Sequence, residues 1–416
     1  MTPGTGLEWG AALRVGVVNG LSSSTSGGGH TFVESVASAI AACASDHEFL
    51  FVPLTDDDGA ARGNGPVGPV RRASQRFGVR RLIAAAARRA GLRLGTDVPS
   101  SQQLTEDFIR TANIDVVWFL SSKDAFPASV PFIATVWDLQ HRLQPFFPEV
   151  GAPMDWAQRE RHFGSCLPRA SRIVVGTQTG KEEVVAFYGV APENVVVAPL
   201  PVADPESTPA DEAPVDVRVK YGIEKDFLFY PAQFWPHKNH VNLLLALDHL
   251  NRNEGVALDL VLTGSDKGNL AYVTKVIAEL GLASRVHILG FVPNADIRGF
   301  YRAAVGLAFA SFFGPDNIPP LEAFRLNCPV VAARVGGAEE QLGNAALFFD
   351  PADPADIARA ILAVHRDDIV RAQLIQNGKQ IVLDRSPDAY VRQICGVLDD
   401  FARVRRCWGR DYSSSA

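Results

Sequence analysis

Short runs of apolar, β-branched residues alternate along this chain with longer stretches in which apolar positions recur at helical spacing. In the first half, the apolar runs fall at residues 13–18, 49–53, 114–120, 132–136 and 171–175. In the second half, they fall at residues 227–230, 258–262, 286–289, 305–310, 330–333 and 346–349. Strands that alternate with helices are typical of parallel sheets covered by helices on both faces. The pattern predicts an α/β protein with two Rossmann-like, doubly wound domains.

A segment without apolar periodicity separates the two sets of strands. From Ala203 to Asp216 the chain reads ADPESTPADEAPVD, a Pro-, Ala- and acid-rich composition typical of a linker or surface loop. We therefore expect one domain in residues 1–205 and a second in residues 206–390. Residues 391–416 are expected to continue a C-terminal helix that returns toward the first domain and to end in a frayed tail.

The composition is that of a globular protein. Of 416 residues, 47% are hydrophobic and 21% are charged, which excludes a disordered chain. The net charge of −6 shows no overall basic bias, so no nucleic-acid partner is expected. The five cysteines form no C-x-x-C motif, which fits a reducing compartment. Because the N-terminus lacks the features of a signal peptide and no apolar run approaches the ~18 residues of a membrane span, we expect a cytoplasmic protein.

One segment is unusually basic. Between Arg71 and Arg93 the chain holds eight arginines, and Leu82, Ile83 and several alanines give part of it an apolar face. A basic amphipathic helix can lie on an anionic bilayer. The alternative is a solvated helix whose arginines pair with acidic residues elsewhere. Peripheral contact with the inner face of the membrane is therefore one of two open interpretations.

Lysine is rare, and one lysine occupies a position of interest. Residues 227–240 read FLFYPAQFWPHKNH, so Lys238 follows an apolar run. Ligands of open α/β sheets bind at the carboxyl ends of strands, where an ammonium is able to neutralise a diphosphate leaving group. Asn239 and His240 are expected either to cap the next helix or to bond the ligand. On spacing alone, Lys238 would more often be a surface lysine.

Glycine-bearing turns follow other apolar runs. The stretch NGLSSSTSGGGH includes Gly28 and Gly29, and LTGSD includes Gly264. Glycines before a helix let backbone amides approach an anion, although a merely flexible turn is an equal alternative. The motif G-x-G-x-x-G is absent, so a nicotinamide dinucleotide is not predicted.

The stretch SFFGPDNIPPLEAFRLNCPVV, residues 311–331, is the most informative. Pro319 and Pro320 suit the first turn of a helix, where a missing N–H costs nothing. The free amides of that turn would face an anion. Glu322 lies one turn inside, where its carboxylate is able to accept two hydroxyl hydrogen bonds from a ribose. Compensation of the helix dipole is the alternative role for Glu322.

Together these motifs resemble the nucleotide-sugar glycosyltransferases of family 4. The resemblance rests on YPAQFWPHKNH, LGFVPNADI and NIPPLEAFRLNCPVVAARVGGAEEQLGNAALFFDP, and it covers residues 227–364, with a looser match before them. It implies the GT-B fold, in which an acceptor-binding N-terminal domain and a donor-binding C-terminal domain face a central cleft. It also implies retaining transfer from a nucleoside-diphosphate sugar, with no cofactor and no metal expected.

The resemblance implies a role for individual residues of this sequence. Lys238 falls on the lysine that contacts the donor diphosphate, and Glu322 falls on the second glutamate of the E-x(7)-E pattern, which holds the ribose. The other expected donor contacts are Gly28, Gly29, Gln233, Asn239, Gly264, Phe291, Val292, Asp316, Asn317, Ile318 and Pro319. Among these, Phe291 and Val292 fall where the backbone meets the base.

Three departures from the family pattern stand out. Gly314 occupies the place of the first glutamate, so Asp316 or Asn317 is expected to take over its sugar contacts. Gln233 replaces an arginine and removes one cation from the diphosphate site. The usual His-Asp pair reads Trp137-Asp138, and His141 follows one helical turn later as a candidate for the displaced histidine. Either His141 is a loop residue, or it joins Asp138, Lys238 and Glu322 as a catalytic residue.

The expected function is transfer of a hexose, with mannose as the first expectation, from a GDP- or UDP-sugar. The acceptor would be the hydroxyl of a glycan or of a lipid-linked molecule, as in polysaccharide biosynthesis. Two alternatives remain: another GT-B chemistry on a nucleotide sugar, such as epimerisation or hydrolysis, and a degenerate protein that binds a nucleotide sugar or a partner without turnover. The absent glutamate and arginine keep the second alternative open.

Overall fold

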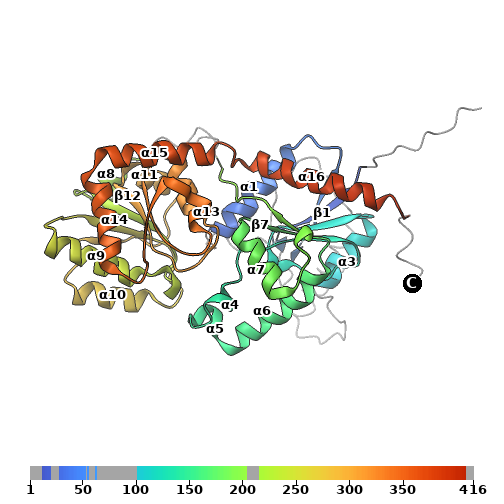
Figure 1. Cartoon of the computed structure of the whole chain (residues 1–416), viewed down its shortest axis with the longest axis horizontal. Helices are drawn as coiled ribbons and strands as arrows, with labels where there is room; N and C mark the ends of the chain where they lie inside the picture. Colours follow the sequence, from blue (N-terminus) through green and yellow to red (C-terminus); the bar gives the residue numbers. More distant parts are fainter. Residues whose placement is uncertain are drawn as a thin grey trace, which may run out of the picture.

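A computed structural model of the chain describes residues 12–19, 28–52, 54–55, 61–62, 101–203 and 215–408. Its framework is a pair of six-stranded parallel sheets, one from each half of the chain (Figure 1). The first has the order β2-β1-β5-β6-β7-β8 and contains β1 (Arg14–Val18), β2 (Glu48–Val52), β5 (Val116–Phe119), β6 (Phe132–Thr135), β7 (Arg172–Val175) and β8 (Val195–Val197). A small antiparallel pair, β3 (Leu54–Thr55) and β4 (Ala61–Arg62), lies apart from it.

The second sheet has the order β11-β10-β9-β12-β13-β14. Its strands are β9 (Phe227–Pro231), β10 (Asp259–Thr263), β11 (Val286–Ile288), β12 (Gly306–Phe309), β13 (Val330–Ala333) and β14 (Ala346–Phe349). Counted along the chain, this is the doubly wound order 3-2-1-4-5-6, which reverses between β9 and β12. The predicted strands are confirmed in both halves. Within the two six-stranded sheets, only β8, three residues long, has no counterpart in the prediction, because so short a run gives little periodic signal. The short strands β3 and β4 are not predicted either.

Helices cover both sheets, as the alternating pattern predicts. In the first half they are α1 (Gly28–Ala42), α3 (Ser101–Thr111), α4 (Gln140–Leu143), α5 (Pro148–Gly151), α6 (Pro153–Cys166) and α7 (Gln178–Tyr188). In the second half they are α8 (Val217–Tyr221), α9 (His240–Asn253), α10 (Leu270–Glu279), α11 (Asn294–Ala303), α12 (Ile318–Arg325), α13 (Ala338–Leu342), α14 (Pro354–Arg366), α15 (Asp368–Val382) and α16 (Pro387–Arg405). The 3-10 turns are η1 (Ser122–Asp124), η2 (Leu167–Arg169), η3 (Pro192–Asn194), η4 (Pro236–Lys238) and η5 (Gly343–Ala345).

Buried side chains on each sheet supply the cores. Val17 pairs with Trp118 in adjacent strands of the first sheet, and both are inaccessible to solvent. In the second sheet, Phe229 stacks on Phe300 of α11 with ring centroids 5.3 Å apart. Such continuous burial is typical of parallel strands that are covered on both faces.

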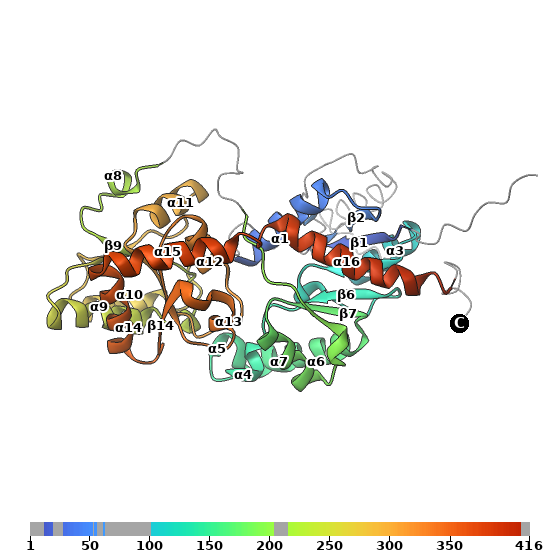
Figure 2. The ribbon, with the colours of Figure 1, turned by 45° about the horizontal axis from the view of Figure 1, so that its top comes forward.

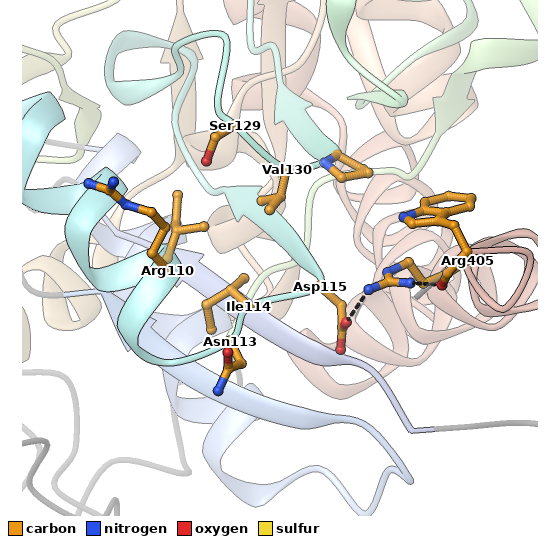
Figure 3. A pocket seen from close by; sticks show the side chains of 10 residues that line it. Arg110, Asn113, Ile114, Asp115, Ser129, Val130 and Arg405 are labelled. Atoms are coloured by element: carbon orange, nitrogen blue, oxygen red, sulfur yellow. Dashed lines mark hydrogen bonds and ion pairs between the residues drawn. The ribbon is translucent and has the colours of Figure 1, made fainter. Parts of the chain in front are cut away.

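The C-terminal helix α16 returns to the first half of the chain, as predicted, and packs beside α1 (Figure 2). Tyr390 of α16 stacks on Trp118 with a centroid separation of 6.3 Å. At the far end of the helix, Arg405 forms an ion pair of 3.1 Å with the buried carboxylate of Asp115, beside a recess of about 210 Å³ that Trp408 also lines (Figure 3). The helix is therefore held to the first sheet along its length.

Some sequence predictions concern residues that the structure does not describe. The arginine-rich segment from Arg71 to Arg93 lies outside the described residues, as do residues 204–214 of the expected linker and residues 409–416 of the expected tail. Of the helices that the structure describes, none combines the length and the apolar character needed to span a bilayer.

Candidate functional site

The carboxyl ends of β9 and β12 lie next to each other where the strand order of the second sheet reverses. The chain leaves β9 through η4, which ends at Lys238, and it leaves β12 through residues 310–317, here called the donor loop. Open α/β sheets bind their ligands at such a switch point. The topology therefore brings together the two stretches that the sequence singles out for donor binding.

Lys238 is half-buried at this point. Its ammonium lies 3.4 Å from the Ser311 hydroxyl and 5.7 Å above the Phe309 ring. Burial lowers the pKa of Lys238 to about 8, while the carboxylates of Asp138 and Glu149 oppose the decrease. The ammonium therefore persists at neutral pH with weak hydrogen bonding, which leaves it able to bind an anion.

Two predicted donor contacts beside Lys238 are engaged within the protein. The Asn239 amide donates to the backbone carbonyls of Ala310 (3.1 Å) and Pro351 (2.7 Å), and its backbone is left-handed at φ 58°. Asn239 thus ties η4 to the end of β12, and its contact with a ligand stays a prediction. The Gln233 amide bonds Ser265 at 3.3 Å and accepts a hydrogen bond from the Trp235 indole at 3.0 Å.

Glu322 lies where the sequence predicts, one turn inside α12, with Pro319 and Pro320 in the first turn. Its carboxylate accepts a hydrogen bond of 2.9 Å from the Tyr301 hydroxyl. Burial raises the pKa of Glu322, and the Tyr301 hydrogen bond partly offsets the increase. Tyr301 also bonds the Pro319 carbonyl at 3.2 Å, so it fixes the carboxylate relative to the start of the helix.

The donor loop is held by its own polar side chains. Asn317 donates to the carbonyls of Phe313 (3.3 Å) and Gly314 (2.9 Å). Asp316 accepts from the Leu200 backbone at 3.2 Å and from the Gln341 amide, and burial raises its pKa to about 7. Both side chains therefore stabilise the loop and its contact with the first half of the chain, and sugar contacts by Asp316 or Asn317 stay a prediction.

Further predicted donor contacts border the switch point. Gly264 follows β10 with φ +136°, and a Cβ there would lie 2.6 Å from the Ala232 carbonyl, so the close approach of the two strand ends requires glycine. Phe291 is 64% exposed beyond β11, whereas Val292 and Ile318 are buried in the core. Phe291 therefore offers an aromatic surface near the strand ends. Val292 and Ile318, whose side chains are buried, would contact a ligand there through their backbone atoms.

On the first sheet, the chain leaving β6 presents Trp137 and Asp138. Asp138 shares a small recess with Glu183 of α7, and Pro315 of the donor loop lines the same recess. Burial and the charge of Asp138 raise the pKa of Glu183 to about 7, and Oε2 of Glu183 is buried without a partner. Glu183 is absent from the sequence prediction, although it lies beside buried Val184 in α7.

His141 does not face the switch point. Its side chain is wholly buried between α4 and α6, stacks on Phe163 at 5.4 Å and lies 2.8 Å from the Glu160 carboxylate. Burial lowers its pKa, against the charge of Glu160. His141 therefore secures α4 and lies in a helix, so the alternative of a loop residue is wrong, while a catalytic role for it stays a prediction without support from this buried placement.

The predicted helix after the glycines is present, but α1 begins at Gly28, so Gly28 and Gly29 lie in its first turn and not in a turn before it. A Cβ at Gly29 would lie 2.9 Å from the Trp137 ring, so the residue that replaces the family histidine packs on the start of α1. Across the described ranges, no group of three or more His, Cys, Asp and Glu side chains is arranged to hold a metal ion.

Several contacts join the two halves around this region, and none of them is part of the sequence prediction. Glu340 of α13 accepts hydrogen bonds from the Thr179 backbone (3.0 Å) and hydroxyl (3.1 Å) at the start of α7. Gln144 donates to the Phe312 carbonyl of the donor loop at 2.7 Å. These pairs are more than 160 residues apart in the chain, beyond the reach of local sequence patterns.

The second half of this arrangement has known counterparts. Residues 216–381 match the family model described as "Glycosyl transferases group 1". This part of the chain is therefore similar to the group 1 glycosyl transferases. It contains Lys238, the donor loop and Glu322, whereas the candidates Gly28, Gly29, Asp138 and His141 lie outside the matched region.

The curated relatives extend the match. A D-inositol 3-phosphate glycosyltransferase from Acidothermus cellulolyticus is 28% identical over 246 residues, which are 57% of this chain and 55% of that protein. The O-antigen chain mannosyltransferase B from Escherichia coli is 26% identical over 213 residues, 50% of this chain and 55% of that protein. The chain thus spans about half the length of the curated relatives it matches.

Solved structures match nearly the whole chain. Anabaena HepE in complex with UDP-glucose superposes with a TM-score of 0.66 at 18% identity, covering 93% of this chain and 100% of that structure. Together with the two parallel six-stranded sheets, this likeness shows that the chain has the GT-B fold, as predicted.

Proposed function

We propose that this protein is a retaining family 4 glycosyltransferase that moves a hexose from a UDP- or GDP-sugar to the hydroxyl of a glycan or lipid-linked acceptor. Mannose is the first sugar to test. The observation that carries the proposal is the position of Lys238, a half-buried ammonium at the sheet's switch point with one long hydrogen bond, beside the donor loop of the region that matches the group 1 glycosyl transferases.

The chemistry follows from that position. The bond between the anomeric carbon and the diphosphate oxygen breaks, and the acceptor oxygen bonds the same carbon on the same face. The acceptor proton passes to the leaving phosphate, so no protein base is required. Lys238 stabilises the negative charge that develops on the diphosphate. Glu322 holds the ribose hydroxyls, and Phe291 offers an exposed ring for the base.

The acceptor side of the proposal rests on Asp138 and Glu183. Both carboxyl groups line the recess under Pro315, and the unpartnered oxygen of Glu183 is available to a hydroxyl group. A buried carboxyl oxygen without a partner is costly unless a ligand satisfies it. We propose that an acceptor hydroxyl occupies this recess while the donor lies against Lys238. A cytoplasmic location, absence of a metal, and membrane contact through Arg71 to Arg93 remain predictions.

The relatives support this class of reaction. The Escherichia coli relative is named as a mannosyltransferase, and the Acidothermus relative acts, by its name, on D-inositol 3-phosphate. HepE was solved with UDP-glucose. A binding protein without turnover is the second candidate, favoured by Gly314 and Gln233, which stand where the family has a glutamate and an arginine.

A thermal-shift panel of UDP, GDP, ADP and TDP tests donor binding and names the base. A ligand at about 100 times its Kd stabilises a protein by about 2.7 kcal/mol, so one nucleotide is expected to raise the melting temperature clearly above the others. No stabilisation by any of the four would contradict the proposal. Nucleotide binding without acceptor-dependent release of the diphosphate, in assays over a set of sugar acceptors, would favour the second candidate.

Replacing Glu322 with glutamine is expected to weaken nucleotide binding about tenfold, because the ribose hydroxyls lose a charged acceptor. Folding should change little, since the glutamine oxygen still accepts from Tyr301. Isothermal titration with the nucleotide chosen by the panel measures the effect. Glu279→Gln on α10 is the matched control, because Glu279 lies exposed beside Lys275. Equal affinities in both variants would remove Glu322 from the donor site.

A further inference from the structure

A carboxylate from the first half of the chain reaches the turn that carries Lys238. Glu149 lies on α5, and its Oε1 accepts hydrogen bonds from the backbone N–H of His237 (2.9 Å) and from the ring Nδ1–H of the same residue. The Glu149 side chain is only 6% exposed and that of His237 11%. A carboxylate removed from water and bonded twice to one residue fixes the position of that residue strongly.

His237 is held on its other sides by the donor loop. Its ring stacks on Phe313 with centroids 4.0 Å apart and planes at 7°. Its carbonyl accepts from the Phe312 N–H at 2.8 Å. Phe147, two residues before Glu149, packs edge-on against Phe313 at 5.1 Å. The segment that carries α4 and α5 therefore contacts both η4 and the donor loop.

The charge on Glu149 is the unusual part of this contact. Burial raises the pKa of Glu149, but its hydrogen bonds with His237 outweigh burial and hold the pKa below its ordinary value. Burial lowers the pKa of His237 to about 4, so the ring is neutral and does not cancel the charge. The other oxygen, Oε2, is buried without a partner. A neutral amide would hold the same turn at less desolvation cost, so holding the turn does not by itself explain a carboxylate.

Lys238 lies in the field of this carboxylate. Four charged or titratable groups lie near it. The charges of Asp138 and Glu149 raise its pKa. Burial lowers the pKa of His237 in η4 and of His240 at the start of α9, and the charge of Lys238 lowers both further. Burial alone would lower the pKa of Lys238 further. Glu149 thus acts on Lys238 in two ways, through the position of η4 and through the charge.

We propose that Glu149 is a positioning residue for the diphosphate site: it fixes the turn that carries Lys238 and places a negative charge near the ammonium. The inference rests on the proposed function, since it concerns the same bound nucleoside diphosphate. It adds that the donor site is complete only when the first half of the chain is docked through α5. Figure 2 shows α5 at the end of the first half that faces the other sheet.

Glu149→Gln separates charge from position, because the amide oxygen still accepts both His237 hydrogen bonds. The kcat/KM for the donor reports the free enzyme, and wild-type kcat/KM should fall as pH rises through about 8, where Lys238 loses its proton. Without the Glu149 charge the pKa of Lys238 decreases. The high-pH limb of the profile, in which kcat/KM falls, should therefore move to lower pH. We expect about a fivefold loss in kcat/KM at pH 8 and little loss at pH 6.

The controls distinguish the possible failures. Glu279→Gln, on exposed α10, should leave the pH profile unchanged. His237→Asn keeps the Glu149 charge but loses the ring contacts, so it should raise the donor KM without moving the high-pH limb to lower pH. If Glu149→Gln does not fold, His237→Asn still tests the positional part of the inference. A Glu149→Gln profile identical to wild type, or a loss equal at all pH values, would overturn the inference. A wild type that neither binds nucleotide nor turns over would instead overturn the proposed function.

Discussion

Lys238→Ala is expected to lower turnover by about 10²-fold or more, because it removes a preorganised charge from the oxygen where negative charge develops. The ammonium has one long hydrogen bond to Ser311 and lies over the Phe309 ring, so few internal contacts are lost. Since burial already disfavours the charged form, the variant should be as stable as wild type or slightly more stable. Functional loss without loss of stability is the signature of a side chain that acts on a ligand.

Steady-state release of the nucleoside diphosphate, together with the melting temperature, measures both parts of this prediction. Lys275→Ala is the matched control, because Lys275 is exposed on α10 and forms a surface ion pair with Glu279 at 3.6 Å. Turnover near that of wild type in Lys238→Ala would remove Lys238 from the reaction. Equal losses in the two lysine variants would indicate a general effect of charge.

The sequence predicts the sheets well, because buried parallel strands are recognisable as continuous apolar runs. It also predicts the position of Lys238, since the carboxyl end of a strand at a switch point is where ligands bind. The start of α12 at Ile318 follows from Pro319 and Pro320, which fit only the first turn of a helix. These predictions depend on residues that are neighbours in the chain.

What the sequence does not predict depends on residues that are distant in the chain. His141 lies at a spacing that fits a displaced histidine. In the structure, however, its ring bonds the Glu160 carboxylate and stacks on Phe163 in the interior. Glu149 and His237 are 88 residues apart, and no local pattern links them. In the sequence, Glu183 does not differ from other acidic residues of helices. Only in the folded protein does Asp138, which follows β6, line the same recess. In each case tertiary contacts decide which side the group faces.

Gly314→Glu, which restores the family glutamate, is expected to destabilise the protein and to give no gain in activity. Gly314 has φ +106°, a conformation that side chains rarely adopt, and a Cβ there would lie 2.6 Å from the Asn317 amide. Forcing such a backbone costs about 1–3 kcal/mol, and displacing Asn317 also breaks the bonds that close the donor loop. The loop is thus built around glycine, and a glutamate does not fit without another loop conformation.

Chemical denaturation measures the free energy of unfolding, and the donor assay measures activity in the same preparations. Gly268→Ala is a suitable control, because Gly268 has φ +98° but open space around it; it carries the backbone strain without the clash. A second variant, Gly314→Ala, adds only the Cβ. The difference between the losses in the free energy of unfolding of Gly314→Ala and Gly268→Ala therefore measures the clash with Asn317 alone. A Gly314→Glu variant as stable as wild type and faster in turnover would contradict this prediction. It would show that the loop readily adopts the family conformation and that glycine at position 314 lowers the activity.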